Sequence, residues 1–267
     1  MTMHILIATD LSDRSDRAVA RGFRLADALG AEATLYAVVD DALPRAAREA
    51  MVERSEAHLR ASLGDRAHMI RVDTGQVVET LVGRVNEGDV DLLVTGRHRA
   101  RALFDAWRPA TVESVIRHSR APVLMVSRPA HDDYRRVLAP IAFSKACLAA
   151  VEIARKLAKG ADFALHHAWT APFEGLTGGP QSSLASAVEA EIAELAREWS
   201  DRLTAPRLEV EMLHGTLGAV FTEQCRKVDP DLIAVGAHTR PASPTGLGSF
   251  AADLVRNPPS DLLFARA

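Results

Sequence analysis

Short, nearly continuous apolar runs alternate along the whole chain with longer stretches whose apolar residues recur every three or four positions. Such runs are typical of strands covered on both faces of a parallel sheet, and the longer stretches have the period of a helix. The expected strands are 4–9, 33–39, 67–72, 91–95 and 123–127, followed by 136–141, 163–169, 208–213, 231–235 and 262–265.

One segment of this pattern occurs twice, about half a chain apart. Residues 91–96 and 231–236 are each an acidic residue, an apolar run and a glycine. A histidine follows two positions after each glycine, His98 in the first case and His238 in the second. We therefore interpret the chain as two copies of one structural unit.

Within each copy, strands and helices alternate, which requires right-handed crossovers and a parallel sheet. We predict an α/β protein of two tandem domains, each a five-stranded parallel sheet with helices on both faces. The polar segment 129–133 lacks periodicity and is the expected linker. The expected domains are residues 1–128 and 135–267.

The helices have expected starting points and buried faces. Ser144 and Thr74 are suited to cap the helices that follow them, because each places a hydroxyl before an apolar periodic stretch. A longer helix in the second copy carries one apolar stripe, formed by Leu184, Val188, Ile192, Leu195, Trp199 and Leu203.

Composition narrows the class of protein. Hydrophobic residues make up 48% of the chain, charged residues 25%, and the net charge is −3, as expected for a globular protein without an electrostatic preference for nucleic acid or anionic membranes. No apolar run reaches the roughly 20 residues that span a bilayer. The chain enters a strand directly after its first residues. We expect a cytoplasmic protein with neither a nucleic-acid nor a membrane partner.

Ligands of parallel α/β sheets bind beyond the carboxyl ends of the strands. After the first strand stands Asp10, whose carboxylate suits a ribose hydroxyl or a metal, or simply the start of a helix with its positive dipole end. Ala142 occupies the same place in the second copy, so no carboxylate role exists there.

The loops after the fourth strands also differ. In the second copy, Gly236 is followed by a loop that ends at Gly248-Ser249, where a helix begins; amides and a hydroxyl at a helix start attract phosphate. In the first copy, Gly96 is followed by a basic loop that ends at Pro109-Ala110, which offers no proline N–H and no hydroxyl. Its arginines suit an anion or a solvated surface.

Other constellations are weak. The sequence contains no G-x-x-x-x-G-K-[ST], G-x-G-x-x-G or H-E-x-x-H motif. Cys147 and Cys225 lack a second cysteine at metal or redox spacing. His166 and His167 are adjacent on an expected strand, so their side chains point to opposite faces and cannot chelate one metal. A histidine of the core or of a strand end is the expected role.

Both copies resemble the universal stress protein domain, an adenine nucleotide alpha hydrolase-like fold. The family's loop has the form Gly-x-x-Gly, nine residues, then Gly-Ser or Gly-Thr, after a strand of the Asp-Leu-Ile-Val-Met-Gly type. The resemblance implies ATP binding there, with Mg²⁺. It also implies that Asp10 and Val38 contact the nucleoside in the first copy, and that Ala168 occupies the place of Val38 in the second.

Each copy departs from the family pattern. The first retains Gly96 but has Arg99, Pro109 and Ala110 in place of the later loop residues. The second retains Gly236, Gly248 and Ser249, while Thr239 replaces the second glycine, the stretch before Gly248 is one residue short and Ala142 replaces the aspartate. The resemblance places the partly retained site on residues Gly236, His238, Thr239, Gly248, Ser249 and Ala168. The family's loop histidine supports the loop, so we expect no catalysis from it.

These observations predict a stress-response protein that binds ATP or a related adenine nucleotide in its second domain without catalytic turnover. One alternative is a ligand-free interaction scaffold in stress signalling; a slow ATPase is another. The resemblance further implies an internal pseudo-dimer in which segments 123–127 and 262–265 meet. A further homodimer of chains is left open.

Overall fold

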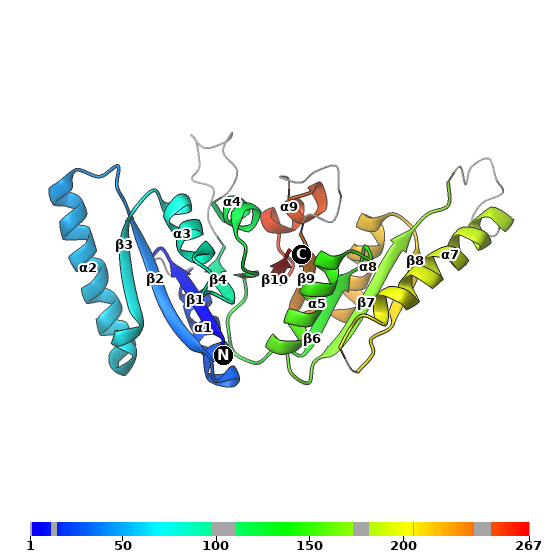
Figure 1. Ribbon diagram of the computed structural model, residues 1–267, viewed down its shortest axis with the longest axis horizontal. Helices are drawn as coiled ribbons and strands as arrows, with labels where there is room; N and C mark the ends of the chain where they lie inside the picture. Colours follow the sequence, from blue (N-terminus) through cyan, green and yellow to red (C-terminus); the bar gives the residue numbers. More distant parts are fainter. Residues whose placement is uncertain are drawn as a thin grey trace. The chain divides into compact units, whose positions relative to one another are not determined.

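The computed structural model describes residues 2–11, 15–97, 111–172, 182–204, 206–237 and 247–266. The chain divides into two compact units, Met1–Asp132 and Asp133–Ala267. Figure 1 shows that each unit is a layered α/β structure with helices on both faces of its sheet.

The first unit begins with β1 and ends with β5. Its described strands are β1 (His4–Thr9), β2 (Glu32–Asp40), β3 (Ile70–Gly75), β4 (Leu92–Gly96) and β5 (Val123–Val126). Its described helices are α1 (Ser15–Leu29), α2 (Arg45–Leu63), the 3-10 helix η1 (Gly64–Met69), α3 (Val77–Asn86) and α4 (Thr111–His118).

The second unit repeats this order. Its described strands are β6 (Arg136–Pro140), β7 (Asp162–Trp169), β8 (Val210–His214), β9 (Leu232–Gly236) and β10 (Asp261–Ala265). Its described helices are α5 (Lys145–Leu157), α7 (Ser183–Ser200), α8 (Leu217–Val228) and α9 (Ser249–Arg256).

The strand order is β3-β2-β1-β4-β5 in the first unit and β8-β7-β6-β9-β10 in the second, and the pairings within each unit are parallel. The order reverses between β1 and β4, and between β6 and β9. Right-handed crossovers therefore place α1 and α2 on one face of the first sheet and α3 and α4 on the other. The predicted fold of two tandem five-stranded parallel sheets is confirmed. The contact between segments 123–127 and 262–265 stays a prediction.

The central strands explain the continuous apolar runs. In β1, Ile5, Leu6 and Ile7 are each 0% exposed, although neighbouring side chains of a strand point to opposite faces. Both faces are therefore covered, as the sequence predicted. No described helix is long and apolar enough to cross a membrane.

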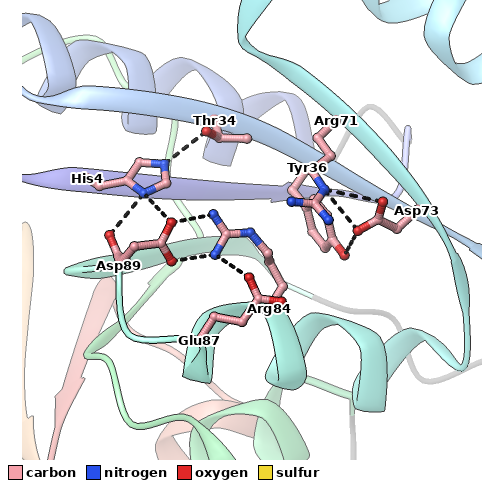
Figure 2. Close-up of polar contacts among 8 residues, drawn as sticks. All are labelled: His4, Thr34, Tyr36, Arg71, Asp73, Arg84, Glu87 and Asp89. Carbon is pink, nitrogen blue, oxygen red and sulfur yellow. Dashed lines mark hydrogen bonds and ion pairs between the residues drawn. The ribbon is translucent and has the colours of Figure 1, made fainter.

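The repeated aspartates tie the amino ends of the strands together. In the first unit, the backbone N–H of His4 donates to Asp91 Oδ2 at 2.8 Å; in the second, that of Arg136 donates to Asp231 Oδ1 at 3.0 Å. The His4 ring also contacts the backbone oxygen of Asp89 at 3.0 Å (Figure 2). The acidic residue before each fourth strand thus has a structural role, far from the carboxyl edge.

One predicted strand is displaced. Residues 67–69 belong to the 3-10 helix η1 rather than to a strand, and β3 runs from Ile70 to Gly75. Asp73 and Thr74 are tolerated in it because β3 is an edge strand and Asp73 accepts a hydrogen bond from Tyr36 Oη at 2.7 Å. Thr74 therefore does not cap α3, whose N-cap is Gln76.

The apolar stripe of α7 is only partly buried. Trp199 is buried, and so is Leu203, which lies beyond the end of the helix at Ser200, but Leu184 is 39% exposed and Leu195 is 46% exposed. The reason is that α7 packs at the edge strand β8, so only a narrow face of the helix is covered. The predicted cap of α5 is confirmed, since Ser144 Oγ accepts from the backbone N–H of Cys147 at 3.1 Å.

Candidate functional site

The carboxyl edge of the first sheet brings three predicted residues to adjacent strand ends. Thr9 pairs with Ala37, so Asp10 follows β1 beside Val38 on β2, while Gly96 ends the neighbouring β4. Asp10 is exposed, and Val38 and Gly96 are half-buried. These residues line the point where the strand order reverses, the usual ligand position of such sheets.

The second sheet has the same edge with different side chains. Ala142 follows β6 and is exposed, and its backbone N–H donates to Cys147 Sγ at 3.4 Å. Ala168, on β7, is half-buried. The next residue after Ala142, Phe143, has a φ of 50°, and Leu11 after Asp10 has a φ of 61°. The two units therefore share the backbone turn while the second lacks the carboxylate.

Gly236 has a packing role that its sequence position does not reveal. A Cβ at this residue would lie 2.5 Å from the backbone N of Cys147 and 2.8 Å from the backbone C of Ala146. The first turn of α5 therefore lies directly against the end of β9. Only glycine permits this approach without movement of backbone.

The start of α9 is open. Gly248 is its N-cap with φ 80° and ψ 145°, and no side-chain hydrogen bond caps the helix among the described residues. By contrast, Ser144 caps α5, and Ser182 caps α7 by accepting from the backbone N–H of Ala185 at 3.2 Å. Gly248 and Ser249 are both exposed. The first amides of α9 and the Ser249 hydroxyl thus suit an anion.

The model of the Universal stress protein family matches residues 1–127 and again residues 133–266. The chain belongs to this family, as a tandem two-domain member. A universal stress protein from Archaeoglobus fulgidus DSM 4304 has 16% identity and a TM-score of 0.65, with 98% of this chain and 96% of that chain covered.

A functionally unknown protein from Pseudomonas aeruginosa PAO1 gives the same identity, 16%, and the same TM-score, 0.65, over 99% of this chain and 92% of that chain. These likenesses show the shared fold. A universal stress protein in complex with cAMP covers 47% of this chain and 97% of its own, at 24% identity and a TM-score of 0.39. No match was found among curated proteins.

Several predicted residues of this universal stress protein lie outside the described residues. They are His98, Arg99, Pro109, Ala110, His238 and Thr239. Within the described part of the chain, no group of three or more His, Cys, Asp or Glu side chains is placed to hold a metal ion. The described part of the candidate site is the exposed start of α9, whose free amides and hydroxyl suit an anionic group.

The paired histidines of β7 have different surroundings, as their alternation on the strand predicts. His167 Nδ1 contacts the backbone oxygen of Ile141 at 2.7 Å, and its ring lies 4.5 Å from that of Phe143. His166 is 1% exposed, and neither of its ring nitrogens has a hydrogen-bond partner among the described residues. Burial and the nearby His167 lower the pKa of His166 to about 4. The sequence predicted a core histidine but not its missing partner.

Proposed function

We propose that this tandem universal stress protein binds ATP or a related adenine nucleotide in its second domain, as a cytoplasmic stress-response protein without catalytic turnover. The observation that supports the proposal is the start of α9, where Gly248 has a φ of 80°, no described side chain caps the helix, and Ser249 is exposed. The phosphates would accept from the first amides of α9 and from the Ser249 hydroxyl. We retain residues 1–128 and 135–267 as the proposed domains.

The carboxyl edges of the two sheets each keep a different part of the family's nucleotide site. In the first domain, Asp10 and Val38 suit the nucleoside, but the loop after Gly96 ends in Pro109-Ala110. In the second, Ala142 offers no carboxylate to a ribose hydroxyl, so the phosphates would supply most of the affinity. The nucleoside would then meet the half-buried Ala168 on β7. Gly236, His238 and Thr239 complete the proposed phosphate loop.

Replacement of Ser249 by aspartate tests the proposal. A carboxylate in the first turn of a helix stabilises it by about 0.3–1 kcal/mol through the helix dipole, but it repels a phosphate at the same place. We expect calorimetry to give heat for ATP with Mg²⁺ in the native protein and roughly tenfold weaker binding, a loss of about 1.4 kcal/mol, in Ser249→Asp. cAMP, the ligand named for one universal stress protein, is titrated in parallel.

The matched control is Ser183→Asp. Ser183 is the exposed first residue of α7 in the same domain, so the substitution has the same helix-dipole effect far from α9. It should leave the heat of ATP binding unchanged. If millimolar ATP gives neither heat nor a thermal shift in the native protein, nucleotide binding is excluded and the interaction scaffold remains. Steady phosphate release that Ser249→Ala abolishes would instead establish a slow ATPase.

A further inference from the structure

His166 lies under the helix layer that carries the proposed phosphate site. Its ring centroid is 6.4 Å from that of Phe221 on α8. The Phe221 ring in turn lies 5.0 Å from Phe250, edge to face at 89°. Phe250 is the second residue of α9, directly after Ser249. A short aromatic path therefore joins His166 to the start of α9.

The first unit shows what His166 lacks. Tyr36 occupies the same position in β2 as His166 does in β7, since each pairs with the second residue of the next strand, Arg71 in one case and Glu211 in the other. Tyr36 donates its hydroxyl proton to Asp73 Oδ2 at 2.7 Å (Figure 2). Leu213 stands where Asp73 would be. The second unit thus keeps a buried polar ring at this position, with no acceptor for it among the described residues.

The neighbouring titratable groups do not compensate. Glu211 on β8 lies on the same side of the sheet, but its side chain is exposed and does not bond the ring. On α8, Gln224 is buried and neutral, Cys225 is half-buried, and the charged Glu223 and Arg226 are exposed. The α9 carboxylate of Asp253 pairs with Arg256. On the adjoining residues of β6, Leu138 and Pro140, no group titrates.

His167, the remaining neighbour, stands on the same strand but contacts Ile141 and Phe143. Its charge would oppose a proton on His166. His166 is 1% exposed, so a proton taken up in the closed structure would meet no hydrogen-bond acceptor among the described residues. Such a buried unpaired charge is costly, and the ring gains a solvated charge only if the layer above it opens.

We propose that His166 is an acid-sensing residue whose protonation opens the α8–α9 layer of the second unit. Opening separates Phe221 from Phe250 and disorders the start of α9. The consequence for a ligand rests on the proposed function: acid would release a phosphate bound at Gly248 and Ser249. The opening itself depends only on the packing of His166 and is measured without any nucleotide.

The pH window follows from the direction of the shift. The folded state lowers the pKa of His166 from 6.5 to about 4, so the closed layer favours the neutral ring. The stability of the closed α8–α9 layer against opening is fully present above pH 6.5 and is lost as the pH falls toward 4. At pH 5 the opening equilibrium should rise by about 20-fold relative to pH 7.

Amide hydrogen exchange of the full chain, without nucleotide, tests the proposal at pH 7 and pH 5. After correction for the intrinsic pH dependence of exchange, peptides of α8 and α9 should lose about 20-fold in protection while those of α5 lose much less. Unchanged protection in α8 and α9 would overturn the proposal. An equal loss in α5 would overturn it as well, because the whole unit would then unfold together.

Two variants remove the effect in different ways. His166→Phe eliminates the titrating group and keeps a ring in the layer. Leu213→Asp places a carboxylate where Asp73 stands relative to Tyr36, so the proton is held in the closed state. Both should abolish the acid-induced loss of protection, and His58→Phe, at an exposed position of α2, should leave it intact. If His166→Phe does not fold, a loss of about 20-fold that persists in Leu213→Asp would still contradict the proposal.

Failure here is distinguishable from failure of the proposed function. If acid opens the layer but ATP never binds, His166 is a sensor and the nucleotide proposal is wrong. If ATP binds and the α8–α9 layer stays closed at pH 5, the nucleotide proposal holds and His166 is not an acid sensor.

Discussion

Replacement of Gly236 by alanine is expected to destabilise the second unit by about 3 kcal/mol, near the upper end of the cost of overpacking. The new methyl group would lie 2.5 Å from the backbone N of Cys147, 2.8 Å from the backbone C of Ala146 and 2.9 Å from the Cα of Cys147. These are backbone atoms at the first turn of α5, so no side-chain rotation can relieve the overlap. Either α5 or the end of β9 must move.

Urea unfolding followed by tryptophan emission measures this loss, because Trp169 and Trp199 are both buried in the second unit. The matched control is Gly218→Ala in α8. A Cβ at Gly218 meets no atom within 4 Å, and alanine is the better helix former, so the midpoint should stay or rise slightly. A Gly236→Ala midpoint equal to that of the control would contradict the close approach.

Gly236 has a proposed role in the phosphate loop and a role in packing, and the sequence predicted only the first. The repeat identified Gly236 as the residue that opens a candidate phosphate loop, and the spacing supports that role. The contact with α5 is made by residues far away in the chain, Ala146 and Cys147, which no local pattern relates to Gly236. Consequently the sequence could not predict that the same glycine also sets the distance between a strand and a helix.

The architecture was predictable because periodicity and repetition act locally. Continuous apolar runs marked the covered strands, and Ser144 marked the start of α5. The errors lie at the sheet edges, where packing rather than local sequence decides. Residues 67–69 were apolar enough for a strand but form part of η1, while Leu184 and Leu195 fit the helical period yet remain exposed.

The candidate site was predictable only as a set of positions. Parallel topology placed Asp10, Val38 and Gly96 at one edge of the first sheet, and the register agrees with that placement. The open start of α9 at Gly248 depends on a backbone angle and on the absence of a described capping side chain, which spacing alone does not give. The missing partner of His166 depends on the side chains that surround it, and Leu213 stands where Asp73 accepts from Tyr36 in the first unit.

Replacement of Arg84 by methionine is expected to cost the first unit roughly 2 kcal/mol, because it removes charge-assisted hydrogen bonds from a nearly buried guanidinium. Arg84 is 8% exposed at the end of α3. Its Nη1 lies 2.5 Å from Asp89 Oδ1 and its Nη2 2.8 Å from Asp89 Oδ2, and Nη1 also pairs with Glu87 at 3.2 Å (Figure 2). Methionine keeps most of the apolar stem and loses these bonds.

The loss of stability caused by Arg84→Met should depend on pH. Hydrogen bonds from Arg84 hold the pKa of Asp89 at about 2, below its usual 3.8. The stabilisation is therefore present above pH 3.8 and is lost as the pH falls through 2, so the native protein and Arg84→Met should converge in acid. Because the Asp89 side chain is 57% exposed, solvent screening makes this acid-dependent part smaller than the loss of the bonds at neutral pH.

Hydrogen exchange of peptides from β1 and α3 reports on the first unit alone and separates this effect from acid opening at His166. Arg60→Met is the control, since Arg60 forms an exposed i,i+4 pair with Glu56 on α2 and should change protection by less than about 0.5 kcal/mol. If Arg84→Met is as well protected from exchange as this control at neutral pH, the Arg84–Asp89 pair contributes no more stability than an exposed surface ion pair. A clear loss would instead establish it as the tie between the end of α3, the base of β4 and, through the His4 ring, β1.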